Sequence, residues 1–147
     1  MVNPAAATPP VGETFLPLAA GRVDEGVKAK SVTGSWRMRI QTNHATDTLT
    51  AQVVHPPGSS SGWHKHAGPV IVTVVEGTLS FYFGHDPTCS PMLVHAGQTV
   101  VEQGGARDPA HYAVNEGSQD VKLLVTTFAP AGVVPRIDVP APGNCPF

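Results

Sequence analysis

The chain has 147 residues, a formal net charge of −2 and thirty glycine and proline residues. This length suits one domain, the many helix-breaking residues disfavour a helical bundle, and 41% hydrophobic residues with little net charge exclude a disordered protein. The nine basic residues form no run that would favour a nucleic-acid partner, and no apolar stretch approaches the roughly 20 residues that a membrane span needs.

The first segment of the chain has no periodic apolar pattern. Residues 1–17 are rich in Ala, Pro and Thr, so we expect an extended or poorly ordered N-terminal arm. Residues 1–10 have neither a basic start nor an apolar core, so we expect no secretory signal within the sequence given.

Short β-branched and aromatic runs, bounded by turn residues, fill the region 18–130 and predict one all-β domain, a sandwich or barrel. Apolar and polar residues alternate along several of these runs, for example at residues 79–83, as they do in strands with one buried face. The run Val70–Val75 is apolar on both sides and predicts a central strand covered on both faces. The best helical candidate, Val23–Ser31, is broken by Gly26 and predicts at most a short turn.

The last segment, residues 131–147, is rich in proline. Proline cannot donate a backbone hydrogen bond to a sheet ladder and is confined to edges and bulges. We therefore expect this segment to run over the surface of the domain as an extended C-terminal strap.

Three of the seven histidines fall in a pattern that could bind a metal ion. His64 and His66 are two residues apart in an extended context, so their side chains leave the same face of the strand. His111 begins another alternating stretch and is the candidate third ligand, because an antiparallel neighbour can bring distant positions side by side. Histidines that are merely hydrogen-bonded or exposed remain the alternative at this point.

The residues around these histidines resemble the two motifs of the cupin superfamily over residues 36–130. The first motif is matched by Gly58-(x5)-His64-x-His66-(x3)-Val70-(x6)-Gly77, with Val70 where the family usually has a glutamate ligand. The second is matched by Gly97 followed by Glu102-Gln-Gly-Gly105 and His111-(x3)-Asn115, with Gln103 in the place of a proline and three extra residues before His111.

This resemblance implies a cupin-type jelly-roll β-barrel in which His64, His66 and His111 hold a divalent transition metal such as Fe, Zn, Mn or Ni. It further implies a small-molecule ligand or substrate and a homodimer. Core positions of a small barrel can also line its mouth, so we expect Val70 and Phe81 in the wall of a pocket.

Valine at position 70 would leave the charge of the ion uncompensated by protein, so we expect the site to favour anionic ligands. Three histidines also leave coordination positions open for a guest. Polar residues that could lie near the site, although each is also an ordinary strand-face residue, are Gln52, His55, Glu102 and Tyr112.

The leading functional hypothesis is a metal-dependent enzyme acting on a small organic molecule by an oxygenase-, isomerase- or lyase-type reaction. Its catalytic residues are not identified by the sequence. The alternatives are a non-catalytic protein that binds a metal or small ligand, and a structural barrel whose histidines hold no ion.

Within the superfamily, residues 62–70, 86–89 and 136–147 resemble a group of small bacterial cupin-domain proteins that are commonly exported. That resemblance implies a disulfide between Cys89 and Cys145, which would clamp the strap to the barrel in the periplasm or outside the cell, with the export signal absent from this sequence. Two unpaired thiols in a cytoplasmic protein are the alternative.

Overall fold

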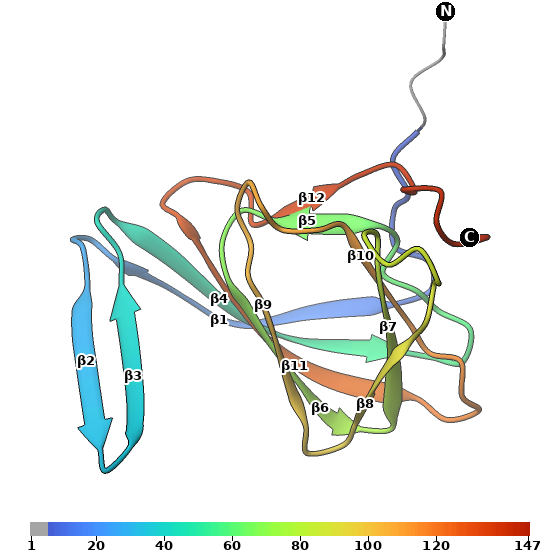
Figure 1. Ribbon diagram of the computed structural model, residues 1–147, viewed down its shortest axis with the longest axis horizontal. Helices are drawn as coiled ribbons and strands as arrows, with labels where there is room; N and C mark the ends of the chain where they lie inside the picture. Colours follow the sequence, from blue (N-terminus) through green and yellow to red (C-terminus); the bar gives the residue numbers. More distant parts are fainter. Residues whose placement is uncertain (1–5) are drawn as a thin grey trace, which may run out of the picture.

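The computed structural model describes residues 6–147, which form twelve strands and no helix (Figure 1). The strands are β1 (Thr14–Val23), β2 (Lys28–Thr33), β3 (Trp36–Gln41), β4 (Thr46–His55), β5 (His64–His66), β6 (Val70–Glu76), β7 (Thr78–Phe83), β8 (Met92–His95), β9 (Thr99–Glu102), β10 (His111–Val114), β11 (Val121–Pro130) and β12 (Arg136–Asp138). The all-β prediction is confirmed. The described part of the chain contains no helix that could cross a lipid bilayer.

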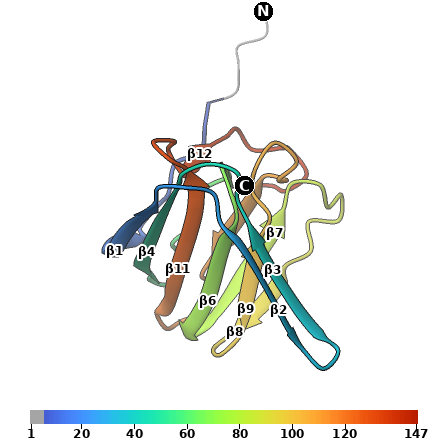
Figure 2. The same cartoon turned by 90° about the vertical axis from the view of Figure 1, so that its left-hand side faces the viewer.

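Ten of the strands form two five-stranded antiparallel sheets that close on each other as a jelly-roll barrel. The larger sheet has the order β1-β4-β11-β6-β9 and the smaller one has the order β12-β5-β10-β7-β8. Both views show the two sheets enclosing a common interior, with β2 and β3 outside it as a separate hairpin (Figures 1 and 2). The ten buried residues of the main core come from both sheets, so burial of their apolar side chains holds the sheets together.

Alternation along the strands explains which face of each sheet is buried. In β6, Val70, Val72 and Val74 are at most 5% exposed and face the core, whereas Val75 is 54% exposed. The prediction that this strand is covered on both faces is therefore wrong. The strand lies between β11 and β9, and nothing in the described chain covers its outer side fully.

The described part of the N-terminal arm lies beside the C-terminal strap, next to the smaller sheet. The first five residues of the expected arm lie outside the described residues, and its last four residues, 14–17, already belong to β1. The described part of the arm is extended, and Thr8 bridges the two ends: its backbone N–H donates to Val139, and its hydroxyl accepts a hydrogen bond from the Trp63 backbone at 2.8 Å. The arm therefore supports the segment that precedes β5.

The strap, residues 131–147, contributes more than surface cover. Its strand β12 pairs with β5 as the edge of the smaller sheet, with Arg136 opposite His66. A disulfide joins Cys89 to Cys145, with their Cα atoms 5.3 Å apart. The strap is thus attached both by a strand ladder and by a covalent bond.

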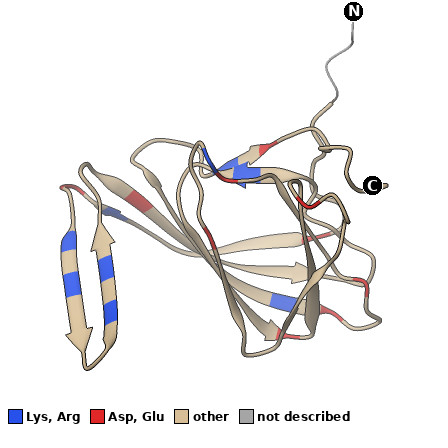
Figure 3. Cartoon of the chain, viewed as in Figure 1, with Lys and Arg blue, Asp and Glu red and all other residues tan. Residues whose placement is uncertain are grey.

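Hairpin β2–β3 projects away from the barrel. The region Val23–Ser31 was expected to form at most a turn, but β2 starts at Lys28 and pairs with β3 along its whole length. Every residue of both strands is exposed. The hairpin has four basic residues and no acidic one (Figure 3).

Candidate metal centre

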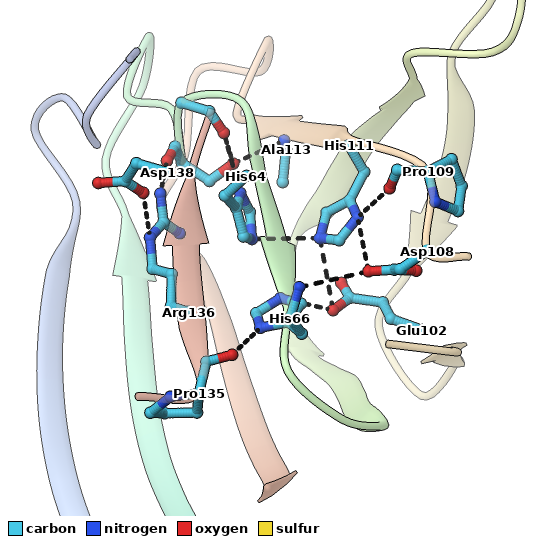
Figure 4. A network of polar contacts seen from close by, with 12 residues as sticks. His64, His66, Glu102, Asp108, Pro109, His111, Ala113, Pro135, Arg136 and Asp138 are labelled. Atoms are coloured by element: carbon cyan, nitrogen blue, oxygen red, sulfur yellow. Dashed lines mark hydrogen bonds and ion pairs between the residues drawn. The ribbon is translucent and has the colours of Figure 1, made fainter. Parts of the chain in front are cut away.

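The structure brings His64, His66 and His111 together inside the barrel (Figure 4). One ligand atom from each of the three lies within 4.8 Å of the others, and all three side chains are buried. The first two leave the same face of β5, as their spacing predicts, and His111 of β10 lies directly opposite His64 in the antiparallel ladder. The two histidines of the two-residue spacing and the histidine that starts a new strand therefore lie side by side.

Each of the three imidazole rings is oriented by a backbone carbonyl. The Nδ1 atoms of His64, His66 and His111 lie 2.9, 3.3 and 3.2 Å from the carbonyl oxygens of residues 62, 135 and 109, respectively. When Nδ1–H donates to a carbonyl, the proton sits on Nδ1 and the lone pair sits on Nε2. This arrangement prepares the three Nε2 atoms as ligands.

Burial keeps the rings of His64 and His111 uncharged at neutral pH. It is the largest cause of a lowered pKa at His64, where the nearby charges of His111 and Arg136 lower the pKa further. Burial also lowers the pKa of His111, against the opposing effect of the Glu102 carboxylate. The Nε2 atoms of His64 and His111 lie only 3.2 Å apart, so two lone pairs face each other unless a proton or a cation lies between them. A divalent cation fits this donor set.

A carboxylate that the sequence left among several candidates lies next to two of the three histidines. Glu102, at the end of β9, is 6% exposed, and its Oε2 lies 2.8 Å from Nε2 of His66 and 3.5 Å from Nε2 of His111. The premise that no protein charge lies near the three histidines is therefore wrong. The residue was hard to identify because its approach depends on the pairing of β6 with β9.

The extra residues before His111 supply a second carboxylate. Asp108 is 3% exposed, and its Oδ2 accepts a hydrogen bond from the His66 backbone N–H at 3.3 Å. The same oxygen lies 3.9 Å from Nδ1 of His111. The longer loop thus connects β5 to the segment before β10 and places a second carboxylate near one ring, which the sequence pattern did not indicate.

Strand β5 is fixed from its outer side by Trp63, which points away from the histidines. This side chain is fully buried and stacks against Phe147 with ring centroids 6.3 Å apart. The Nε1–H of Trp63 also donates to the main-chain oxygen of Phe147 at 3.1 Å. Tyr112 packs against both rings, with its ring centroid 5.4 Å from that of Trp63 and 4.7 Å from that of Phe147. Tyr112 therefore belongs to this outer cluster and not to the candidate metal centre.

A cavity of about 300 Å³ opens beside the histidines. Its wall is mostly apolar and includes the two expected residues, Val70 and Phe81, with valine and leucine side chains from both sheets. His64, His66 and Glu102 line one part of it. An apolar cavity thus lies next to the only cluster of three potential metal ligands found in the described chain.

The polar wall of the cavity contains two further residues that the sequence did not single out. Arg136 donates from Nε to Asp138 at 2.7 Å and from a terminal nitrogen to the Ser61 carbonyl. Glu13 lies 3.2 Å from Nε2 of His55, and burial raises the pKa of Glu13. His55, the last residue of β4, is thus a buried cavity residue and one of the polar residues that the sequence suggested could lie near the site. Gln52 does not line the cavity.

Comparison with known proteins agrees with this architecture. The family model described as cupin domain matches residues 51–127, which contain all three histidines and Glu102. A search of curated proteins finds no match.

Solved structures share the fold at low sequence identity. A cupin-like protein from Thermotoga maritima superposes with a TM-score of 0.50 at 18% identity, over 64% of this chain and 65% of its own length. The chain thus spans less than two thirds of that protein. An uncharacterized protein with a double-stranded β-helix domain from Klebsiella pneumoniae gives a TM-score of 0.51 at 16% identity, over 78% of this chain and 84% of its own. The family match and the jelly-roll barrel together show that the chain belongs to the cupin domain family.

Proposed function

We propose that this chain binds a divalent transition metal through the Nε2 atoms of His64, His66 and His111 and acts on a small organic molecule held in the adjacent cavity. The observation that carries the proposal is the convergence of three buried imidazoles, each with its Nδ1 atom turned to a backbone carbonyl. A bound ion would supply Lewis acidity or redox chemistry to a ligand in the cavity. The reaction type that fits is oxygenase-, isomerase- or lyase-like.

The chain's own residues have separable roles in this proposal. The apolar wall, with Phe81 and Val70, excludes water and accepts the carbon skeleton of the ligand. Arg136 and the pair of Glu13 and His55 offer polar contacts in the same cavity. Because His55 has its pKa lowered to about 4, mainly by burial, it is neutral at physiological pH and can donate or accept a hydrogen bond there.

A non-catalytic metal or small-ligand binding protein is the second candidate. It is supported by the chemistry of the cavity wall, where apolar residues predominate and the side chains of Arg136, His55 and Glu13 already have partners within the chain. Oxygen uptake in the presence of phenolic or thiol compounds, measured with metal-loaded protein, separates an oxygenase from a passive binder.

The metal site itself is tested by elemental analysis of untagged protein purified without chelator. We expect close to one equivalent of a transition metal in the wild type and loss of most of it in His66→Ala. His44→Ala is the matched control, because His44 is exposed and outside the cluster. Equal metal content in the wild type and His66→Ala would contradict the proposal. The same analysis names the metal among Fe, Zn, Mn and Ni.

We also propose an oxidising compartment, periplasmic or extracellular, for the mature protein. The disulfide between Cys89 and Cys145 supports this location, since such bonds persist outside the cytoplasm. Fractionation of the native host, with the non-reduced thiols trapped by alkylation, tests it. A homodimer is likewise proposed, and the exposed hairpin β2–β3 supports it.

A further inference from the structure

Glu102 lies opposite the position at which the first motif of the chain lacks its usual glutamate ligand. The first motif of the chain has Val70 where cupins usually have a glutamate, yet Val70 and Glu102 are directly opposite each other in the antiparallel pairing of β6 with β9. Directly opposed residues have Cβ atoms about 5 Å apart and point to the same face of the sheet. A glutamate moved across the ladder from one position to the other can therefore reach the same space.

Glu102 is buried and one of its carboxylate oxygens accepts no hydrogen bond, as expected of a carboxylate that binds a cation. Its side chain is 4% exposed, and Oε2 accepts no hydrogen bond from any described residue although it lies 2.8 Å from Nε2 of His66. A buried carboxylate oxygen without a hydrogen bond is costly unless a positive charge compensates it. The groups next to it are the Nε2 atoms of His66 and His111. Each of these atoms carries a lone pair when the Nδ1–H of its ring donates to a backbone carbonyl.

We propose that Glu102 is the fourth protein ligand of the metal and replaces, from strand β9, the glutamate that β6 lacks. This inference rests on the proposed metal site. The three histidines and one carboxylate would then give the site a protein charge of −1 and reduce the net charge that a divalent ion presents to the cavity.

The test measures metal affinity by titrating chelator-treated protein with Co²⁺ and following the visible spectrum, with Zn²⁺ competition for tight binding. Glu102→Gln keeps the shape of the side chain and removes its charge, and we expect the affinity to fall by about 10- to 100-fold. The matched control is Glu13→Gln, which neutralises another carboxylate of the same cavity that is not part of the histidine cluster. We expect its affinity to stay within twofold of the wild type.

Exchanging the residues at positions 70 and 102 tests the proposal more directly than Glu102→Gln. Glu102→Val alone should lose affinity, and the double variant Val70→Glu with Glu102→Val should regain at least tenfold over it, because the carboxylate returns from the opposite strand. Circular dichroism establishes that each variant is folded, and Glu102→Gln decides the question if the exchange variant does not fold. Unchanged affinity in Glu102→Gln, or a folded exchange variant without recovery, would overturn this role for Glu102. A wild type that binds neither ion would instead overturn the metal site as a whole.

Discussion

The Nε2 atoms of His64 and His111 lie 3.2 Å apart inside the barrel, although the two residues are 47 positions apart in the sequence. Both rings have Nδ1 turned to a carbonyl, so the short separation sets two lone pairs against each other in the absence of a cation. The folded protein holds this repulsion because burial and the strand pairing of β5 with β10 fix both rings. A cation that binds the folded chain removes the repulsion and stabilises the fold.

Metal addition should therefore raise the stability of chelator-treated protein. Binding to the folded state alone contributes about 2.7 kcal/mol to the free energy of unfolding at a free metal concentration one hundred times the dissociation constant. Urea denaturation with and without Zn²⁺ measures this difference. His64→Gln should abolish most of it, and an equal effect of Zn²⁺ in that variant would show that the ion binds elsewhere.

The sequence predicted the three histidines because their arrangement follows from local rules. A two-residue spacing places His64 and His66 on one face of any strand, and the start of an alternating stretch marks His111 as the beginning of the next ligand-bearing strand. Position 102 could not be assigned in the same way. Its side chain reaches the site only because β6 and β9 pair with Val70 opposite Glu102, and such a register depends on long-range contacts.

Strand β2 and the contact between His55 and Glu13 were also not predicted from the sequence. Lys28–Thr33 has small and charged residues in place of a strong apolar alternation, so β2 was missed, although Gly34 in the turn before Trp36 is a hairpin signal. His55 ends β4, and its partner Glu13 immediately precedes β1. Only the pairing of β1 with β4 makes them neighbours.

Removal of the Asn115 amide should cost stability without touching the metal. This side chain is fully buried, donates to the carbonyls of His55 and Gln119 at 2.7 Å each, and accepts from the backbone of Gly117 at 2.9 Å. Asn115→Ala leaves buried carbonyls unpaired, so we expect a loss of about 2–4 kcal/mol in the free energy of unfolding. Urea denaturation measures the loss, and Asn43→Ala, an exposed site, is the control. A loss of metal from folded Asn115→Ala would give the residue a different role.

Reduction of the disulfide should loosen the strap and destabilise the barrel. The bond between Cys89 and Cys145 closes a loop across 56 positions of sequence separation, and chain entropy alone gives an upper bound of about 4 kcal/mol for its contribution. We expect a phosphine reductant to lower the thermal midpoint of the wild type. A variant with both cysteines replaced by serine should start at the lower midpoint and not respond. Alkylation of two thiols in unreduced wild type would contradict the bond.

Stability should fall in weak acid because of His55. Burial lowers its pKa from 6.5 to about 4, and the charge of Arg136 acts in the same direction. Between these two pH values the unfolded chain binds the proton and the folded chain does not, so the free energy of unfolding decreases as the pH falls through this window. The full difference is about 3 kcal/mol, at 1.36 kcal/mol for each pKa unit.

The contribution of His55 can be separated from that of the other buried histidines by substitution. His55→Gln keeps a hydrogen-bonding side chain beside Glu13 and cannot gain the proton, so its unfolding free energy should depend less steeply on pH between 6.5 and 4. Chelator-treated protein is required for both chains, because metal bound to the three ligand histidines has its own pH dependence. Parallel curves for the wild type and His55→Gln across this range would mean that His55 is already protonated in the folded protein, and the ion pair with Glu13 would then be the stable state of this corner of the cavity.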